Sequence, residues 1–336
     1  MTLQKSQQYL DQMSRRFQES CLLQAAAELD IFTVLLQHGN RLSAEELTAV
    51  MQMDRRAAEM LSDALAAAGF LEKKEQHYSV PATYTELLDS RSPATFVPML
   101  RHMANVQRAW SQLAKTVKTG LPPQTKPSIL GAEEDRRSFI WAMNSVAQAL
   151  AEPVVESLRQ AGLLTFRKMI DIGGASGTYT QAFLKAVPEL SSVIFDLPVG
   201  IEAAKKRFLG SEYESRVQFA EGDIFLNELP AGFDFAWISA VIHQFNRDAS
   251  RLLYKKTFSA LQSGGQIAVR DFVMQPDRTA PQAGTLFGIN MLVETASGMV
   301  YTWDEIREDL ESAGFNDIRL AVPSATMSAV VAASKP

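Results

Sequence analysis

The first third of the chain repeats apolar side chains with the spacing of helices. Between positions 9 and 38 they recur every three or four residues, which is typical of amphipathic helices. Ser43 and Glu46 form a capping-box pattern that predicts a helix running toward Met51. Asp54 predicts the cap of a further helix that ends at Gly69.

Two short strand-like runs follow these helices. Residues 70–72 and 77–80 carry aromatic and β-branched side chains, and a charged segment at 73–76 joins them. Helix, helix and hairpin in this order predict a winged-helix module in residues 1–95. Because the stripe at 9–38 is too apolar to remain solvated alone, we expect this domain to form a homodimer.

The remainder of the chain divides into a helical segment and an alternating segment. Residues 96–160 are mostly helical in pattern, and Gly120 to Gln124, with two prolines, interrupts them. From 161 to 336, short apolar runs alternate with helical stretches, which predicts an α/β domain with a parallel sheet and helices on both faces. The expected strands are 168–172, 193–197, 217–220, 233–239 and 266–273.

Composition and charge exclude several classes of protein. The chain has 336 residues, 46% of them hydrophobic and 21% charged, enough for a large core and a smaller one. A net charge of -5 gives no general attraction for nucleic acid or anionic lipid. The one cysteine and four scattered histidines offer no disulfide or zinc spacing, so we expect no metal. Without a signal-like or membrane-spanning apolar run, a cytoplasmic location is expected.

A glycine-rich turn follows the first expected strand of the α/β domain. Asp171 to Gly177 reads DIGGASG, and a dinucleotide fingerprint ending at Gly177 would require glycine at position 172, where isoleucine stands. NAD therefore fits poorly. A carboxylate before the turn suits a ligand that carries an ammonium group rather than a pyrophosphate. S-adenosylmethionine has such a group.

Acids also end the next two strands. Asp196 can accept hydrogen bonds from both ribose hydroxyls, and Asp223 can bond an adenine amine while its apolar neighbours cover the ring. Either acid alone could be an ordinary turn residue. In register at successive strand ends they favour a nucleoside site, because ligands of open α/β sheets bind beyond the carboxyl ends of the strands.

These segments together resemble a known enzyme family. Nearly the whole chain is similar to small-molecule O-methyltransferases with an N-terminal winged-helix dimerisation domain, a group that includes plant caffeate and flavonoid enzymes and bacterial natural-product enzymes. The resemblance implies S-adenosylmethionine as cofactor and a Rossmann-like class I methyltransferase domain with a mostly parallel seven-stranded sheet. It rests on the N-terminal helices and hairpin and on the segments 171–177, 195–198, 222–225, 242–245, 261–265, 271–273, 290–293 and 301–315.

The resemblance also implies roles for individual residues. Gly173 and Ser239 would lie at the methionyl end of the cofactor, Asp196 at the ribose, and Asp223 with Ile224 and Phe245 at the adenine. The complete set of cofactor-binding residues is Gly173, Asp196, Leu197, Gly222, Asp223, Ile224, Ser239 and Phe245.

Catalysis is expected at a histidine that follows the strand 233–239. His243 matches the general base of the family, and Asp271 matches an acid that orients it. Neutral imidazole can take a hydroxyl proton near pH 7. A second acid found in plant-type members is missing, because Met299 and Val300 stand near its place. Glu294 is an alternative, although a solvated loop role suits it better.

Acceptor-binding residues are expected in two places. Met143 in the helical connector, and Asn290 and Met291 after the strand 266–273, fall where relatives line the acceptor pocket. Methionines at helical spacing are more often core residues. An amide among apolar neighbours needs a buried partner, which a small-molecule acceptor could supply at Asn290.

Two other functions remain open on the sequence. A winged-helix regulator would need a basic recognition helix, but residues 39–84 hold five basic side chains against seven acidic ones. Relatives with the same cofactor half methylate carbon or nitrogen, or catalyse non-methylating reactions, and the acceptor pocket decides among these outcomes.

Overall fold

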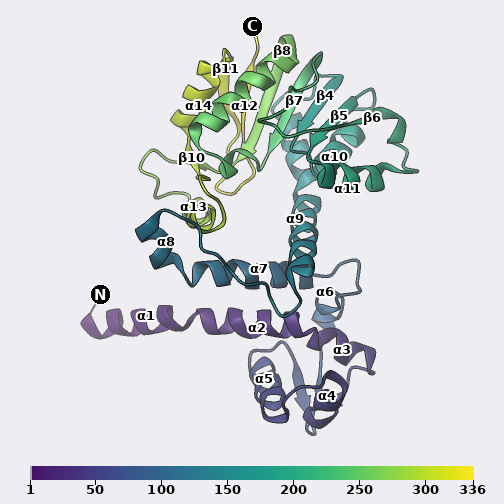
Figure 1. The fold of residues 1–336 in the computed structure, drawn as a ribbon, viewed down its shortest axis with the longest axis vertical. Coiled ribbons are helices and arrows are strands. Elements are labelled where there is room, and N and C mark those ends of the chain that lie inside the picture. Colours follow the sequence, from purple (N-terminus) through teal and green to yellow (C-terminus); the bar gives the residue numbers. More distant parts are fainter. Residues whose placement is uncertain (1) are drawn as a thin grey trace. The chain divides into compact units, whose positions relative to one another are not determined.

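The computed structural model describes residues 2–336. The chain forms two compact units (Figure 1). The first comprises the residues up to Ser111 together with Gln124–Met143, and the second comprises Gln112–Pro123 and Asn144–Pro336. The long helix α9 (Ala132–Gln160) contributes residues to both units.

The first unit is mainly helical, as its apolar spacing predicts. The predicted helix caps are confirmed: Ser43 and Glu46 exchange both capping-box hydrogen bonds at α4, and the Asp54 carboxylate accepts from the Ala57 amide at α5. A core of apolar side chains including Phe32, Leu35, Leu47, Leu65 and Tyr78 joins these elements. The helices are α1 (Leu3–Arg15), α2 (Phe17–Leu29), α3 (Ile31–Gln37), α4 (Ala44–Met51), α5 (Arg55–Ala67), η1 (Ala82–Tyr84), α6 (Thr85–Leu88) and α7 (Val97–Trp110).

The hairpin of this unit differs from the predicted one. The strands are β2 (Glu72–Lys74) and β3 (His77–Ser79), and a two-residue β1 (Leu42–Ser43) pairs with β3 on its other side. The prediction that residues 70–72 form the strand and 73–76 the turn was wrong. The turn is Glu75–Gln76, both with positive φ, because the two-residue turn that matches strand twist requires this backbone.

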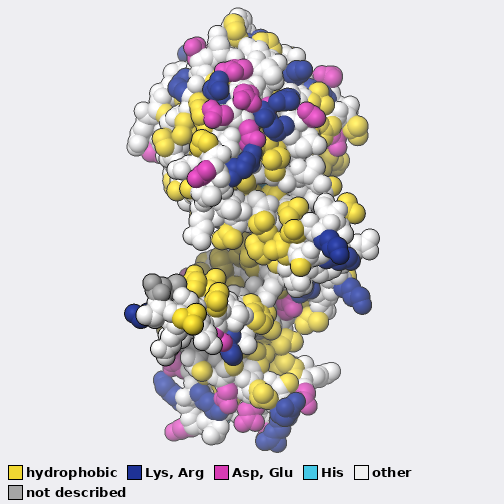
Figure 2. All heavy atoms as spheres, turned by 90° about the vertical axis from the view of Figure 1, so that its left-hand side faces the viewer, with side chains coloured by type: hydrophobic (Ala, Val, Ile, Leu, Met, Phe, Trp, Pro, Cys, Tyr) yellow, Lys and Arg dark blue, Asp and Glu magenta, His cyan; other side chains and the backbone are white. Residues whose placement is uncertain are grey.

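Helix α1 leaves apolar side chains uncovered. None of its residues is buried within the chain, although apolar residues recur along it. In Figure 2 hydrophobic side chains gather beside the N-terminus. The exposed ones on α1 and at the start of α2 are Leu3, Tyr9, Leu10, Met13 and Phe17.

The second unit contains the predicted seven-stranded sheet. Its order is β11-β12-β8-β7-β4-β5-β6, with parallel pairing throughout except at β12, which runs antiparallel to both of its neighbours. This confirms the mostly parallel, Rossmann-like class expected from the sequence. The strands are β4 (Lys168–Ile172), β5 (Ser191–Asp196), β6 (Val217–Glu221), β7 (Phe233–Ser239), β8 (Leu261–Asp271), β11 (Asn316–Val322) and β12 (Ala329–Ser334).

Helices cover both faces of this sheet (Figure 1). One core packs the C-terminal half of α9, with α10 (Thr178–Ala186) and α11 (Pro198–Phe208), against one face. The other core packs α12 (Arg247–Ala260) and α14 (Trp303–Ser312) against the opposite face. The remaining elements are α8 (Leu113–Thr119), η2 (Glu214–Arg216), η3 (Ile242–Gln244), β9 (Val273–Met274), α13 (Gln282–Glu294) and β10 (Tyr301–Thr302).

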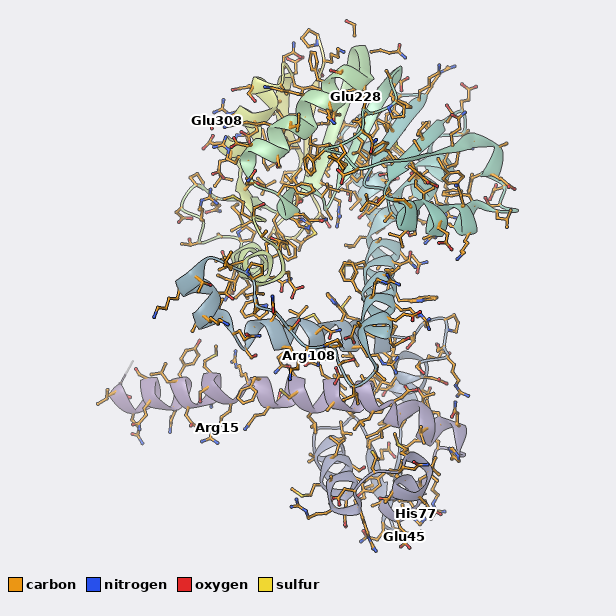
Figure 3. The ribbon with its side chains drawn as sticks, in the orientation of Figure 1. Arg15, Glu45, His77, Arg108, Glu228 and Glu308 are labelled. Atoms are coloured by element: carbon orange, nitrogen blue, oxygen red, sulfur yellow. The ribbon has the colours of Figure 1, made fainter. Side chains whose placement is uncertain are left out.

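Ion pairs link helices within each unit, and Figure 3 labels one residue of each pair, Arg108 and Glu308. In the first unit, Arg108 on α7 donates to Glu28 on α2 at 2.8 Å. In the second unit, Arg247 on α12 donates to Glu308 on α14 at 2.9 Å and to the buried Asp309. Within residues 2–336 no helix is both long and apolar enough to cross a membrane.

Candidate active site

The glycine-rich loop connects β4 to α10 at the carboxyl edge of the sheet. Gly173 and Gly177 both have φ of +74°, a conformation that glycine adopts without strain. At Gly173 a Cβ atom would also lie 2.7 Å from the Val241 side chain, so the loop passes directly beside the chain that leaves β7. Only glycine fits this position.

Asp171 lies beneath the loop rather than facing solvent. It is 2% exposed, and its Oδ2 accepts from the Thr180 hydroxyl at 2.6 Å. Burial raises the pKa of Asp171 to about 7. A Cβ at Gly174 would touch this carboxyl group at 2.7 Å, so the backbone of the loop rests on it. The acid that precedes the loop therefore supports the turn from below.

Asp196 ends β5 and is half-buried beside the loop. Its Oδ2 accepts from the Ala175 amide at 2.7 Å, and its Oδ1 accepts from the Leu197 amide at 2.6 Å. Burial raises its pKa, while these two amides lower it. Each oxygen keeps a lone pair for a further donor. The Leu197 side chain is 49% exposed at the same strand end.

The next strand end lies against that of β5. The Gly222 amide donates to the Asp196 carbonyl at 3.0 Å, and the Gly173 amide donates to the Phe195 carbonyl at 2.8 Å. A Cβ at Gly222 would be 2.6 Å from the Phe195 ring. The structure thus brings Gly173, Asp196 and Gly222 together at one edge, as the sequence predicts.

Aromatic and apolar side chains accompany Asp223. Its Oδ1 accepts from the Phe225 amide at 2.7 Å, and the Phe225 ring meets Phe245 edge-to-face with centroids 4.7 Å apart. Ile224 and Phe245 are half-buried against the α12 and α14 core. An acid flanked by apolar faces is the arrangement that the sequence predicts for a base-binding site.

His243 and Asp271 form a buried pair. His243 is 7% exposed and Asp271 is 2% exposed. The imidazole Nδ1 lies 2.8 Å and 3.0 Å from the two Asp271 oxygens, one of which also accepts from the Phe272 amide. Since the carboxylate can only accept, Nδ1 carries the proton and Nε2 keeps its lone pair. Among the described residues nothing bonds Nε2.

Helix α13 supplies the neighbours of this pair. The Phe287 ring meets the His243 imidazole edge-to-face, with ring centroids 4.8 Å apart. Asn290 and Met291 follow Phe287 by three and four residues, so they share its side of the helix. Asn290 is half-buried and Met291 is 7% exposed. Met143 belongs to the first unit and is 39% exposed. Glu294 ends α13 and is exposed.

Sequence reasoning missed a clasp that holds the glycine-rich loop. Arg207 on α11 donates to the Ser176 carbonyl at 2.7 Å and to Asn144 Oδ1 at 2.5 Å. The same Asn144 oxygen accepts from the hydroxyls of Ser176 and Thr178, each at 3.1 Å. The family resemblance places Asn144 in the acceptor pocket, whereas here it holds the loop, and no motif marks Arg207, because the residues that interact come from three separate helices and a loop.

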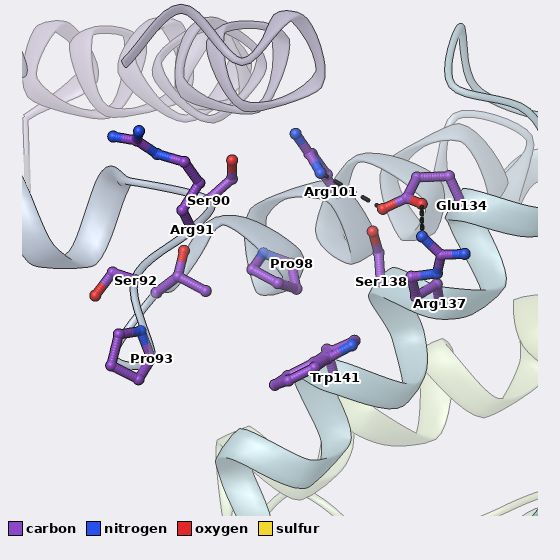
Figure 4. A pocket seen from close by; sticks show the side chains of 11 residues that line it. Ser90, Arg91, Ser92, Pro93, Pro98, Arg101, Glu134, Arg137, Ser138 and Trp141 are labelled. Carbon is purple, nitrogen blue, oxygen red and sulfur yellow. Dashed lines mark ion pairs between the residues drawn. The ribbon is translucent and has the colours of Figure 1, made fainter. Parts of the chain in front are cut away.

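A pocket of about 380 Å³ lies within the first unit (Figure 4). Trp141 and Pro98 form apolar walls, and the charged side chains among its lining residues are paired. Glu134 forms ion pairs with Arg101 and Arg137, with nitrogen–oxygen distances of 3.6 Å and 3.2 Å. Among residues 2–336, histidine, cysteine and acidic side chains form no group of three or more that could hold a metal ion.

The sequence matches the models of two protein domains. The model of the O-methyltransferase domain matches residues 110–316, and that of the O-methyltransferase dimerisation domain matches residues 12–87. The chain belongs to the O-methyltransferase family. The glycine-rich loop, Asp196, Asp223 and the His243–Asp271 pair all fall within the residues that the O-methyltransferase domain model matches.

Individual members of this O-methyltransferase family are similar over almost the whole chain. The tetracenomycin polyketide synthesis 8-O-methyl transferase TcmO of Streptomyces glaucescens is 30% identical, covering 93% of this chain and 92% of TcmO. Acetylserotonin O-methyltransferase of Gallus gallus is 27% identical, covering 93% of each chain. The crystal structure of human N-acetylserotonin methyltransferase in complex with SAM shares the fold, with a TM-score of 0.81, 24% identity and coverage of 98% and 97%.

Proposed function

We propose that this O-methyltransferase transfers a methyl group from S-adenosylmethionine to a hydroxyl group of a small molecule, with His243 as general base. The observation that carries the proposal is the buried His243–Asp271 pair at the carboxyl edge of the sheet. It leaves one imidazole nitrogen with a free lone pair. The phenolic or natural-product class of acceptor is supported by relatives such as TcmO.

The residues at the sheet edge fit the proposed cofactor. Asp196 can grip the ribose, because both of its oxygens retain acceptor capacity beside the loop. Asp223, Ile224 and Phe245 would hold the adenine, with Leu197 and Gly222 beside them, and Gly173 and Ser239 would face the methionyl group. Gly173 and Gly222 have no room for a Cβ atom, which suits close approach of backbone to ligand. The bound cofactor supplies an activated methyl group on a sulfonium.

His243 moves one proton in the proposed step. Its Nε2 takes the proton of the acceptor hydroxyl, which raises the nucleophilicity of that oxygen. Asp271 holds the proton on Nδ1 and stabilises the imidazolium that forms. General-base assistance of this kind contributes about 10²- to 10⁴-fold to the rate. Alignment of the two reactants supplies the remainder.

Helix α13 is the proposed wall of the acceptor site. Phe287 touches the base, and Asn290 with Met291 lies on the same side of the helix. An apolar wall with one amide suits an aromatic acceptor that carries a hydroxyl or carbonyl group. We propose Met143 as a further acceptor contact on the strength of the family resemblance.

The assembly and location are also proposals. The dimerisation-domain match and the uncovered apolar side chains of α1 support a homodimer built through a winged-helix domain. A monomeric mass in light scattering at micromolar concentration would contradict it. A single cysteine, Cys21, is compatible with a cytoplasmic location.

Product analysis tests the reaction itself. The wild-type protein is incubated with S-adenosylmethionine labelled in its methyl group and a panel of phenolic and polyketide-like compounds. The account predicts label on oxygen, whereas label on carbon or nitrogen would favour the alternative methyltransferases. His243→Ala should lower turnover at least about tenfold while leaving cofactor affinity nearly intact. Unchanged turnover in His243→Ala would remove this residue from the mechanism.

A further inference from the structure

Arg270 is a buried cation without an anionic partner. It lies on β8, is 4% exposed, and donates from Nη1 to the Ser239 hydroxyl at 2.9 Å. In the part of the chain that the structure describes, its Nε has no hydrogen-bond partner and no carboxylate forms an ion pair with it. Burial lowers its pKa. A buried guanidinium left in this state is unfavourable, so a partner is expected.

Two further donor groups, the Tyr179 hydroxyl and the Trp237 indole, lie in the neighbourhood of Arg270. The guanidinium carbon lies 5.1 Å from the centre of the Tyr179 ring, and Tyr179 in turn contacts Trp237 with centroids 5.4 Å apart. Within residues 2–336 the Trp237 indole nitrogen has no hydrogen-bond partner, and the Tyr179 hydroxyl faces Ser239, which already accepts from Arg270. This neighbourhood therefore has an excess of donors and lacks an acceptor.

The two acids that interact electrostatically with Arg270 or with Tyr179 already have other partners. Asp171 accepts from Thr180 at 2.6 Å, and burial raises its pKa to about 7. Asp271 points to the other side of its strand, where it accepts from His243 and the Phe272 amide. In the described part of the chain neither acid forms an ion pair with Arg270.

Arg270 stands at the edge of the sheet where the proposed cofactor binds. It is the penultimate residue of β8 and pairs in register with Ser239, the last residue of β7. Its carbonyl accepts from the Ala240 amide at 2.9 Å, and the following residue, Val241, packs against Gly173 of the glycine-rich loop. The guanidinium thus donates to Ser239 at the end of β7, the position that the family resemblance places beside the methionyl group.

We propose that Arg270 binds the carboxylate of the methionyl group of S-adenosylmethionine, with Ser239 orienting the guanidinium toward it. The inference rests on the proposed function, because it needs that cofactor at this edge. A carboxylate supplies the acceptor that the neighbourhood lacks. The guanidinium is suited to it, since its donors form a planar fork matched to a carboxylate.

Two product analogues isolate the carboxylate. S-adenosylhomocysteine carries it, and S-adenosyl-3-thiopropylamine, the decarboxylated analogue, keeps the adenosine, sulfur and ammonium groups without it. Calorimetric titration of the wild type should show at least about tenfold tighter binding of S-adenosylhomocysteine. Equal affinity for the two would overturn the inference without any variant.

Variants then assign the effect to Arg270. Arg270→Met should weaken S-adenosylhomocysteine at least about tenfold and change the analogue by less than about threefold. Arg270→Lys keeps a charge but not the planar fork, and it should show an intermediate loss confined to S-adenosylhomocysteine. An equal loss for both ligands in Arg270→Lys would mean that the residue only supports the fold. That result would overturn the inference even if Arg270→Met did not fold.

Arg216 provides the matched control. It also donates to backbone carbonyls of the same unit, namely those of Leu184, Val187 and Leu190, which precede β5 at the amino edge of the sheet. Arg216→Met should lower stability and change both affinities by the same factor. A wild type that binds neither nucleoside would refute the proposed function itself, whereas binding without discrimination would refute only the role of Arg270.

Discussion

Replacement of Asp171 by asparagine should make the stability of the protein less dependent on pH. The carboxyl group is 2% exposed, and burial raises its pKa from an ordinary 3.8 to about 7. The folded state therefore keeps the Asp171 proton at pH values where the unfolded state has lost it. Unfolding free energy contributed by this group falls as pH rises from about 4 to about 7.

The size of the effect follows from the same values. A difference of roughly three pKa units between the folded and unfolded states corresponds to about 4 kcal/mol of unfolding free energy. Because the site can relax around the charged form, we expect a change of about 2–4 kcal/mol. Asparagine keeps the shape and an acceptor for Thr180 but does not ionise. The gain in unfolding free energy of Asp171→Asn over wild type should therefore grow by that amount between pH 4 and pH 8.

Urea denaturation at fixed protein concentration measures this gain at a series of pH values. Comparison of variant with wild type at each pH cancels the other titrating groups. Asp317→Asn, at an exposed strand position, is the control and should show no such trend. A gain for Asp171→Asn that stays constant from pH 4 to pH 8 would refute the assignment of a buried, protonated carboxyl group under the loop.

Three further changes test separate parts of the account. Asp271→Asn should lower kcat about 10²-fold or more without changing cofactor affinity. The Phe272 amide should still bond the side-chain oxygen of the new asparagine, so its NH₂ group donates to His243 Nδ1 and the imidazole proton moves to Nε2. An unchanged kcat in steady-state kinetics would exclude Asp271 as the residue that orients His243. Ala175→Gly should raise unfolding free energy by about 0.5–1 kcal/mol in urea titrations, because Ala175 has φ of +47°; a loss of stability would contradict the assigned strain. Leu10→Asp, at a site 66% exposed on α1, should give a monomer in light scattering, and an unchanged dimer mass would locate the interface elsewhere.

The central strands of the second unit could be predicted to the residue. Residues 168–172 and 233–239 form β4 and β7 as expected, because strands buried on both faces are continuous apolar runs. Strand β8 starts at Leu261 rather than Gln266. Its first residues include Gly264 and Gly265, which are typical of a turn. In the structure both exchange backbone hydrogen bonds with Lys335, beside the end of β12.

The hairpin of the first unit was harder to predict because its strands are short and exposed. All three residues of β2 are exposed, so no burial pattern distinguishes strand from turn. Lys73 and Lys74 were expected in the turn for their charge, yet both lie in the strand. The positive φ angles of Glu75 and Gln76 form the turn that sets the register of β2 and β3. Glutamate and glutamine are not typical of positive φ, so the sequence does not predict a turn at these residues.

The residues of the candidate site also differ in how well the sequence predicts them. Asp196, Asp223 and His243 follow strands whose ends could be predicted, so their convergence at one edge could be anticipated. Arg207 and Arg270 could not be found in this way. Arg207 bonds residues far away in sequence, and Arg270 is a charged residue on a strand face where the pattern leads one to expect an apolar side chain.

Two phenolic acceptors of different acidity test the general base most directly. Single-turnover methyl transfer at saturating S-adenosylmethionine is measured with wild type and His243→Ala, using a phenol accepted in the screen and its nitro-substituted analogue, which is already ionised at assay pH. The account predicts a wild-type to variant rate ratio of about 10²-fold for the neutral phenol and close to one for the ionised phenol. The same large ratio for both would contradict proton removal by His243.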